Sequence, residues 1–354
     1  MKNRSMKKIW SLCLCMALLI SLLSGCGSGG ADQSAENTGE TEAAVENDGG
    51  QEAAEEGAEP AEAAAETESS ESTGSIKIGW TDANLSNESN AICADAAVAR
   101  AKELGVELIV NDGEGTSDKQ IAQCESFVSQ RVDAVIISPF DFDACVTAAQ
   151  VCVDAGIPVF VAKGLIADMS VVETYVGSND YNAGTMEMQY IADLLNGEGN
   201  IVIIEGPTGV TGAVLRNEGI NDVLAENPGI NVLYSQPADW YRDRAMELME
   251  NWLQLGADID AVVAHNDEMA LGAYDALEAA GITDVPVIGI DGIQAAVESV
   301  GAGKMKASIL QDSKTIGSKA IDVAIDLANG KSVEKEYDIP YQLIEKENYT
   351  DFLE

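Results

Sequence analysis

Basic side chains, aromatic rings and histidine are scarce in this chain of 354 residues. It carries 20 Lys and Arg against 60 Asp and Glu, aromatic residues make up 5% of it, and His265 is its one histidine. The net charge of −40 repels phosphate, which excludes nucleic acid as a partner. Because His265 has no evident Ser or Cys partner, the chain lacks the nucleophile and base of a hydrolytic enzyme. We therefore do not expect an enzyme.

Ligand sets for metals and cofactors are also missing. The cysteines after residue 75 fall at expected helix positions and form no CxxC pair; they are Cys93, Cys124, Cys145 and Cys152. We expect buried thiols there, no metal site and no cofactor. The glycine-rich turn at 206–212 has the spacing GxxGxxG rather than GxGxxG, so it gives little support to a dinucleotide site.

Charge and composition change sharply along the first 74 residues. Met1–Lys8 is basic, Ile9–Leu23 is apolar, and Leu23-Ser24-Gly25-Cys26 resembles the lipobox of a bacterial lipoprotein signal peptide. The resemblance implies cleavage before Cys26, which would then carry the lipid. Residues 27–74 contain 14 acidic and no basic side chains, with almost no large apolar residue. We expect 1–26 to be a signal peptide and 27–74 to be a disordered acidic linker.

From residue 75 onward, short apolar runs alternate with segments of helical periodicity. This alternation predicts parallel sheets covered by helices on both faces. The length allows two such α/β units, with a cleft between them. No apolar run in this part is long enough to span a membrane.

The turn His265-Asn266-Asp267 follows one of these apolar runs and precedes a predicted helix. Its polar side chains can cap that helix. In open parallel sheets, however, ligands bind beyond the carboxyl ends of the strands, where this turn is expected. The residues alone leave both interpretations open.

Several motifs of the second unit resemble bacterial sugar-binding proteins of the ribose-binding type, the receptors of ABC importers. The matching segments are His265–Ala273, Tyr234–Trp240, Arg216–Gly219, Ile288–Gly292, Ser308–Gln311 and Gly177–Asp180 with Gly184. The resemblance implies two lobes, each a parallel sheet between helices, joined by a three-stranded hinge with crossings near Asn179, Gln311 and Pro340. The first lobe would comprise 75–178 and 312–339, and the second 179–311 and 340–354.

The resemblance also implies which side chains bind the ligand. In the second lobe and at the first crossover they are Trp240, Asn266, Asp291, Gln311, Arg216 and Asn179. A tryptophan ring can stack on the apolar face of a sugar, and the polar side chains can pair its buried hydroxyls. By this interpretation Asp267 caps the helix, Asn266 points into the cleft, and His265 has no assigned role.

The first lobe departs from the family pattern. Where relatives place adjacent phenylalanines, this chain has Asn87, Ser89 and Asn90, and Lys163-Gly164 replaces an Asp-Arg pair. Phe140 or Trp80 could supply a second stacking surface, although either could equally be core. A hexose, polyol or modified sugar fits this wall better than ribose, and Lys163 would also tolerate an acidic group.

These patterns predict an extracytoplasmic, lipid-anchored, monomeric receptor, attached to the membrane through its lipid anchor only. It would capture a monosaccharide or sugar-like polyol and deliver it to an ABC permease with its ATPase. An alternative output is a sensor kinase or chemoreceptor. A transcription repressor shares this core fold, but the place of its DNA-binding helices is taken here by the signal peptide and linker.

Overall fold

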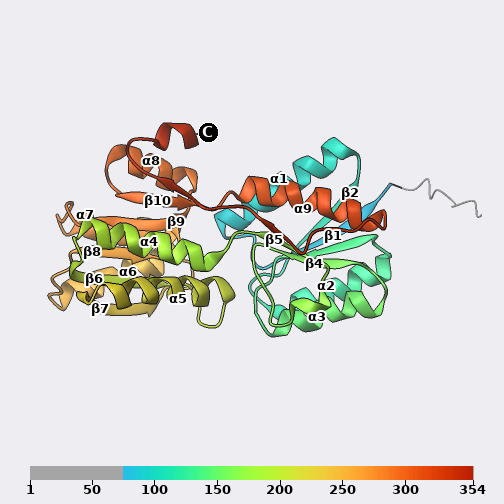
Figure 1. Ribbon diagram of the computed structural model, residues 1–354, viewed down its shortest axis with the longest axis horizontal. Helices are drawn as coiled ribbons and strands as arrows, with labels where there is room; N and C mark the ends of the chain where they lie inside the picture. The colour runs from blue at the N-terminus through green and yellow to red at the C-terminus, as the bar shows by residue number, and fades with distance from the viewer. Residues whose placement is uncertain (1–74, 354) are drawn as a thin grey trace, which may run out of the picture. The chain divides into compact units, whose positions relative to one another are not determined.

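The computed structural model describes residues 75–353, in which strands and helices alternate along most of the chain (Figure 1). The predicted signal peptide, the acidic linker and Cys26 lie outside the described residues. Within 75–353, no helix is both long enough and apolar enough to cross a membrane.

The first sheet has six parallel strands in the order β11-β5-β4-β3-β1-β2. Its strands are β1 (Lys77–Asp82), β2 (Glu107–Asp112), β3 (Ala134–Ile137), β4 (Val159–Ala162), β5 (Tyr175–Gly177) and β11 (Glu336–Asp338). The helices of this lobe are α1 (Glu88–Leu104), α2 (Ser117–Gln130), α3 (Ala144–Asp154) and α9 (Ser313–Ala328), with the 3-10 helix η1 (Met169–Val171) before β5. In Figure 1, α1 and α9 lie on one side of the sheet, with α2 and α3 on the other.

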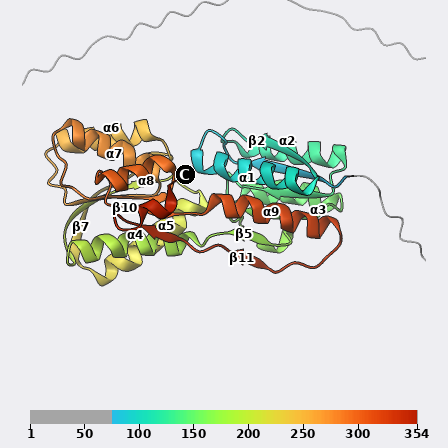
Figure 2. The ribbon, with the colours of Figure 1, turned by 90° about the horizontal axis from the view of Figure 1, so that it is seen from above.

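The second sheet also has six strands, in the order β12-β10-β9-β8-β6-β7, and only β12 runs antiparallel to its neighbour. The strands are β6 (Glu198–Glu205), β7 (Gly229–Pro237), β8 (Ala261–Ala264), β9 (Val287–Asp291), β10 (Ala307–Leu310) and β12 (Gln342–Ile344). The helices are α4 (Asp180–Leu194), α5 (Thr211–Glu226), α6 (Arg242–Gln254), α7 (Asp267–Ala279) and α8 (Gln294–Ala302), with η2 (Tyr349–Phe352) near the end. Figure 2 shows α4 and α5 on one side of this lobe, and α6 and α7 on the other.

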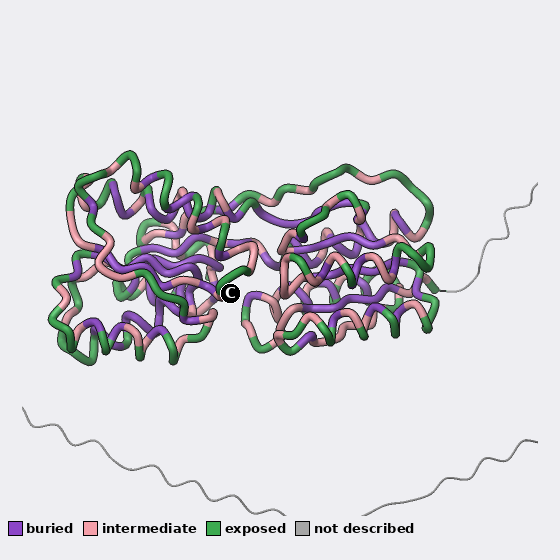
Figure 3. Tube along the Cα trace, turned by 90° about the horizontal axis from the view of Figure 1, so that it is seen from below, coloured by how far each residue is buried: buried purple, intermediate pink, exposed green. Residues whose placement is uncertain are grey.

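Both sheets bury apolar side chains on both faces, as the alternation along single strands shows. In β6, Val202 and Ile204 join the core beneath α6 and α7, while Ile201 and Ile203 join the core beneath α4 and α5. The strands are accordingly buried between helices that are exposed only on their outer faces (Figure 3). A parallel sheet needs cover on both faces, and both lobes provide it. The predicted fold class is confirmed.

The chain passes between the two sheets at three places. It leaves the first sheet between β5 and α4, returns between β10 and α9, and crosses again between β11 and β12 (Figures 1 and 2). Asn179, at the first crossing, is exposed and caps α4, its side chain accepting a hydrogen bond from the amide of Tyr181 at 3.1 Å.

Glycine lets paired helices approach closely. A Cβ atom added to Gly184 of α4 would lie 2.0 Å from the carbonyl oxygen of Arg216 in α5. The same closeness recurs between α1 and α9, where a Cβ on Gly317 would lie 2.0 Å from the carbonyl oxygen of Cys93. Since backbone atoms cannot give way as a flexible side chain can, any larger residue must push the helices apart.

We expect Gly184→Ala to lower the free energy of unfolding by about 1–3 kcal/mol, because α4 and α5 must separate. Gly212→Ala is the matched control, since a Cβ there would lie no closer than 3.5 Å to any other residue. The control should leave stability unchanged or raise it by up to roughly 1 kcal/mol, the ordinary helix preference of alanine. Urea denaturation of both variants measures the difference, and equal stabilities would contradict the close approach.

Candidate functional site

A cavity of about 590 Å³ lies between the two lobes, and its walls are built at the carboxyl ends of strands from both sheets. In the first lobe the lining residues follow β1, β2, β3 and β4. In the second lobe they follow β6, β7 and β8 or lie at the ends of β9 and β10. Such strand ends are where open parallel sheets bind ligands.

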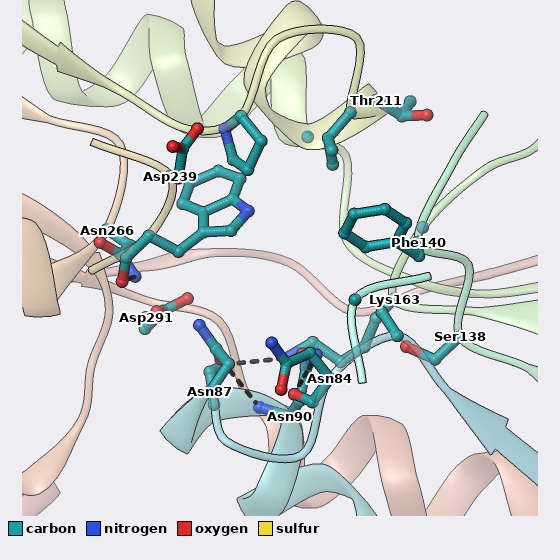
Figure 4. Close-up of a pocket in the computed structure, with 18 of the residues that line it drawn as sticks. Asn84, Asn87, Asn90, Ser138, Phe140, Lys163, Thr211, Asp239, Asn266 and Asp291 are labelled. Carbon is teal, nitrogen blue, oxygen red and sulfur yellow. Dashed lines mark hydrogen bonds between the residues drawn. The ribbon is translucent and has the colours of Figure 1, made fainter. Parts of the chain in front are cut away.

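Nine of the ten side chains predicted to bind a ligand line this cavity. They are Trp240, Asn266, Asp291, Gln311 and Arg216 from the second lobe and its hinge, and Asn87, Asn90, Lys163 and Phe140 from the first. Asn179 does not line it, because its side chain caps α4; its neighbour Asp180 does. The strand ends also bring Asn84, Ser138, Thr211 and Asp239 to the wall (Figure 4).

Trp240 lies against Gly206, which follows β6. A Cβ on Gly206 would fall 2.2 Å from Cη2 of the indole, so only glycine leaves room for the ring in this position. The guanidinium carbon of Arg216 is 5.6 Å from the ring centroid, a cation–π distance. Trp240 also has a φ of 72°, a conformation that a residue with a side chain rarely adopts. The position of the indole is therefore fixed by two features: the backbone conformation of Trp240 and the contact of the ring with Gly206.

Arg216 is almost fully buried and joins the cavity to the hinge. Its Nε donates to Oδ1 of Asp180 at 2.9 Å, and its Nη1 donates to the carbonyl oxygen of His265. The hydroxyl of Tyr341 donates to Oδ1 of Asp180 at 2.9 Å and accepts a hydrogen bond from Nε2 of Gln311 at 2.8 Å. Asp180, Gln311 and Tyr341 belong to the three separate crossings, so this network ties the crossings together.

Burial alone would lower the pKa of Arg216, but the nearby charges outweigh burial and raise that pKa above its usual value. The largest opposing influence is the carboxylate of Asp180, followed by Tyr341 and Asp291. Arg216 therefore stays charged at neutral pH.

The prediction that Asp267 caps the helix is wrong. Asn266 is the residue that caps α7, its Oδ1 accepting from the amide of Met269 at 3.0 Å, and it also lines the cavity. Asp267 is fully buried and accepts from the amides of Gly292 and Ile293, at 2.7 and 3.1 Å. It also accepts from the hydroxyl of Ser308. Asp267 thus fixes the end of β9, and Asn266 serves as both cap and wall.

Asp291 reaches the cavity from the end of β9. Its φ of 133° is unusual for a residue with a side chain, and the amides that Asp267 holds are those of the next two residues. Burial raises the pKa of Asp291, while the charges of Arg216 and Lys163 and a hydrogen bond from Ser89 lower it. Lys163 and Ser89 belong to the first lobe, so both lobes act on this carboxyl group.

Asparagine side chains form the wall of the first lobe nearest to β1. Asn87 caps α1, its Oδ1 accepting from the amide of Asn90 at 3.2 Å, and Nδ2 of Asn90 donates to the carbonyl oxygen of Asn84 (Figure 4). Phe140 adds an aromatic surface to this lobe. Trp80 does not, because it is buried in the core beneath α1 and α9.

Lys163, at the end of β4, takes a backbone φ of 63°. Its Nζ donates to the hydroxyls of Ser89, at 2.7 Å, and Ser313, at 3.1 Å. The two hydroxyls lie 3.0 Å apart. Ser89 belongs to α1 and Ser313 opens α9 directly after the second crossing, so the lysine joins three elements at the cavity wall.

The sequence matches the periplasmic binding protein domain over residues 78–332. The chain belongs to the periplasmic binding protein family. A putative rhizopine-binding protein of Rhizobium meliloti is 36% identical over 255 residues, which cover 70% of this chain and 82% of that protein. The ribose import binding protein RbsB of Bacillus subtilis is 34% identical over 79% of this chain and 90% of its own length.

Solved structures agree with this membership. An ABC transporter solute binding protein from Bacillus halodurans C-125, with bound myo-inositol, has a TM-score of 0.76 at 40% identity. The match covers 79% of this chain and 97% of that one. The predicted resemblance to the ribose-binding type is confirmed, and the protein is an extracytoplasmic binding protein rather than an enzyme, as predicted.

The sequence assigned no role to His265. In the structure it supports the cavity wall on the side of Trp240. Its buried imidazole accepts a hydrogen bond at Nδ1 from the amide of Gly206, at 3.2 Å. Burial and the charge of Arg216 lower the pKa of His265 to about 3, so the ring is neutral at physiological pH. His265 thus helps to hold the glycine on which the indole lies.

Within residues 75–353, no group of His, Cys, Asp and Glu side chains is arranged to hold a metal ion. The four cysteines in this range are free and buried, which confirms the prediction of core thiols.

Gly206→Ala should displace the indole of Trp240 and weaken ligand binding by about tenfold, a loss of ~1.4 kcal/mol. The test compares ligand titrations of the variant with those of Gly212→Ala, a glycine of the cavity wall at which a Cβ would make ordinary contacts. Tryptophan fluorescence of the unliganded variants should report the displacement. Unchanged emission and affinity in Gly206→Ala would show that the ring does not depend on this contact.

Proposed function

We propose that this binding protein captures a monosaccharide or a sugar-like polyol and delivers it to an ABC importer. The observation that carries the proposal is the cavity itself, where Trp240 lies beside polar side chains contributed by both lobes. A ring of carbons bearing hydroxyls needs a flat apolar surface and several donors and acceptors at once. The relatives named for ribose import and bound to myo-inositol support this ligand class.

Each wall has a proposed part in binding. Trp240 stacks on the ring, Asp291 accepts hydrogen bonds from hydroxyls, and Asn266, Gln311 and Arg216 complete the contacts of the second lobe. A carboxylate that accepts from hydroxyls forms charge-assisted bonds, which orient a ligand strongly. On the first lobe, the contacts are proposed for side chains that line the opposite wall: Asn87, Asn90, Lys163 and Phe140. We assign no ligand contact to Asn179.

Closure of the two lobes about the three crossings would trap the ligand and signal occupancy to the permease and its ATPase. For this motion we propose a first lobe of 75–178 and 312–339, and a second of 179–311 and 340–354. Contacts already join the two rims. Nδ2 of Asn84 lies 3.5 Å from the hydroxyl of Tyr241, and the hydroxyl of Thr211 donates to the carbonyl oxygen of Leu165 at 3.2 Å.

We favour an importer over a sensor kinase or chemoreceptor as the recipient, because one relative is named for ribose import and another for an ABC transporter. Permease and ATPase genes beside this one would agree with that output, whereas a kinase gene would favour the alternative.

The membrane attachment is a separate proposal, based on the lipobox ending at Cys26. Cleavage would remove 1–26 and leave Cys26 lipidated, with the acidic residues 27–74 as a tether. Such a tether of 48 residues would keep a monomeric receptor close to the permease and raise its effective concentration there.

Titration with a panel of monosaccharides and polyols, followed by calorimetry and tryptophan fluorescence, tests the proposed ligand class. We expect at least one member to bind, and Trp240→Ala to weaken that binding by about 10–100-fold, because the stacking surface is lost. Trp240→Phe is the matched control and should keep most of the affinity. Binding by none of the panel, or full affinity in Trp240→Ala, would refute the assignment.

Mass spectrometry of the protein from bacterial membranes tests the anchor. We expect a mature chain that begins at a diacylated Cys26, and a Cys26→Ser variant that appears in the soluble fraction. A mature protein with an unmodified or missing Cys26 would contradict the lipoprotein proposal without affecting the ligand site.

A further inference from the structure

Four half-buried apolar side chains line the cavity and have no part in the ligand contacts assigned above. They are Phe142, Leu165, Pro207 and Val210, and we call them the apolar end of the cavity. Leu165 packs against the core beneath α2 and α3, whereas the other three belong to none of the hydrophobic cores in the described part of the chain. Packing within the lobes therefore does not account for these side chains.

In the first lobe, a backbone contact brings two of these residues together. Phe142 lies in the loop after β3, and Leu165 lies in the segment after β4. The amide of Ala167 donates to the carbonyl oxygen of Phe142 at 2.9 Å, so the two segments run side by side at the cavity wall.

The second lobe meets this segment through the start of α5. The hydroxyl of Thr211 donates to the carbonyl oxygen of Leu165 at 3.2 Å. Val210 directly precedes Thr211, and its amide donates to the carbonyl oxygen of Pro207 at 3.3 Å. The apolar residues of the two lobes are thus brought to the same place.

The apolar end lies apart from the polar groups of the second-lobe wall. Figure 4 shows Thr211, the neighbour of Val210, across the cavity from Asn266 and Asp291. Along α5, six residues separate Val210 from Arg216, which corresponds to about 9 Å of helix. A ring bound to the polar groups would therefore meet the apolar end only through a substituent that points toward α5.

A hydroxyl group would find few partners at the apolar end. The carbonyl oxygens of Phe142, Leu165 and Pro207 already accept the hydrogen bonds described above, and the hydroxyl of Thr211 is used in one of them. Burying a hydroxyl without a partner costs free energy, whereas burying an alkyl group is favourable. The surface therefore favours a group that forms no hydrogen bond.

Charged side chains close to the apolar end in the sequence are directed elsewhere. Asp141 accepts from the amides of Asp143 and Ala144 at the start of α3, at 3.0 and 2.7 Å. Neither Asp141 nor Asp143 lines the cavity, and Nζ of Lys163 donates to two serine hydroxyls. These charges give a polar substituent no reason to lie there.

We propose that the apolar end binds an alkyl group carried on an oxygen of the ligand, which is therefore an ether or glycoside of a sugar or polyol. This inference rests on the proposed function and names the substrate class of the same site. The cavity of about 590 Å³ lies within the range of roughly 300–1,000 Å³ for pockets that hold ligands larger than one sugar ring. The alkyl group covers apolar surface that an unsubstituted ring leaves in contact with water.

Calorimetric titration of the full-length protein with matched probes tests the proposal. D-glucose, D-ribose and myo-inositol are the parents, and each is compared with its mono-O-methyl derivatives, one for every hydroxyl. We expect at least one derivative to bind about fourfold more tightly than its parent, and the O-ethyl derivative at the same position to gain a similar factor again. At the other positions the methyl group replaces a hydroxyl proton needed by the polar wall, so affinity should fall.

Two variants test whether the gain arises at the apolar end. Phe142→Ala and Val210→Ala should each lower the ratio of derivative to parent affinity by about threefold or more, because the alkyl group loses its contacts. Val214→Ala is the matched control. It makes the same change one turn further along α5, at a side chain that is 44% exposed and does not line the cavity, and should leave the ratio unchanged. Since both affinities come from one protein, a general loss of folding cancels in the ratio.

The outcomes separate this proposal from the proposed function. If a parent binds and every derivative binds more weakly, the alkyl site is refuted while the sugar receptor stands. If Phe142→Ala and Val210→Ala weaken parent and derivative by the same factor, these side chains serve closure of the lobes and the alkyl site is again refuted. If neither parents nor derivatives bind, the proposed function fails together with the alkyl site.

Discussion

The buried guanidinium of Arg216 is the interaction on which the rest of the molecule depends. An arginine can be taken out of water only if its charge and its donors are matched, and here Asp180, the His265 carbonyl and Tyr341 match them. Because Asp180, Tyr341 and Gln311 come from three different crossings, satisfying one charge fixes where the chain passes between the sheets. The same side chain lies over the face of Trp240. The hinge and the binding surface are therefore parts of one hydrogen-bonded unit.

Unusual backbone conformations concentrate around the cavity. Among the described residues, seven other than glycine have a positive φ, and five of these line the cavity: Glu114, Lys163, Asp239, Trp240 and Asp291. A conformation of this kind costs free energy, so it persists only where the surroundings hold it. At Asp291 the support is Asp267, which grips the two amides that follow. These conformations thus lower the stability of the fold at residues whose side chains must point into the cavity.

Much of this arrangement could be predicted from the sequence, because it depends on periodicity and on strand ends. The alternation of apolar runs and helical segments predicts the two parallel sheets. The resemblance of the strand-end motifs to the ribose-binding type predicts the cavity positions of Asn266, Asp291 and Gln311. In a parallel sheet the carboxyl ends of all strands lie at the same edge, so residues that follow different strands are brought together there.

The remaining features depend on contacts between distant segments, which no local pattern reveals. Asn266 and Asp267 are both good capping residues, and only the packing of β9 and β10 against α7 decides that Asp267 turns inward. Tyr341 lies 161 residues from Asp180, so no local sequence pattern predicts the hydrogen bond between their side chains. From the sequence, Trp80 could equally line the cavity or belong to the hydrophobic core. Only its packing beneath α1 and α9 shows that it belongs to the core. Asn179 does not line the cavity, because its side chain caps α4, and the next residue, Asp180, lines it instead.

The distribution of cysteine has a practical consequence of its own. All four thiols between residues 75 and 353 are fully buried, and all belong to the first lobe, in the cores beneath α1 and α9 or α2 and α3. An alkylating reagent can reach them only when that lobe opens, whereas opening of the second lobe exposes none. The protein therefore carries a natural chemical reporter that distinguishes the local unfolding of one lobe from that of the other.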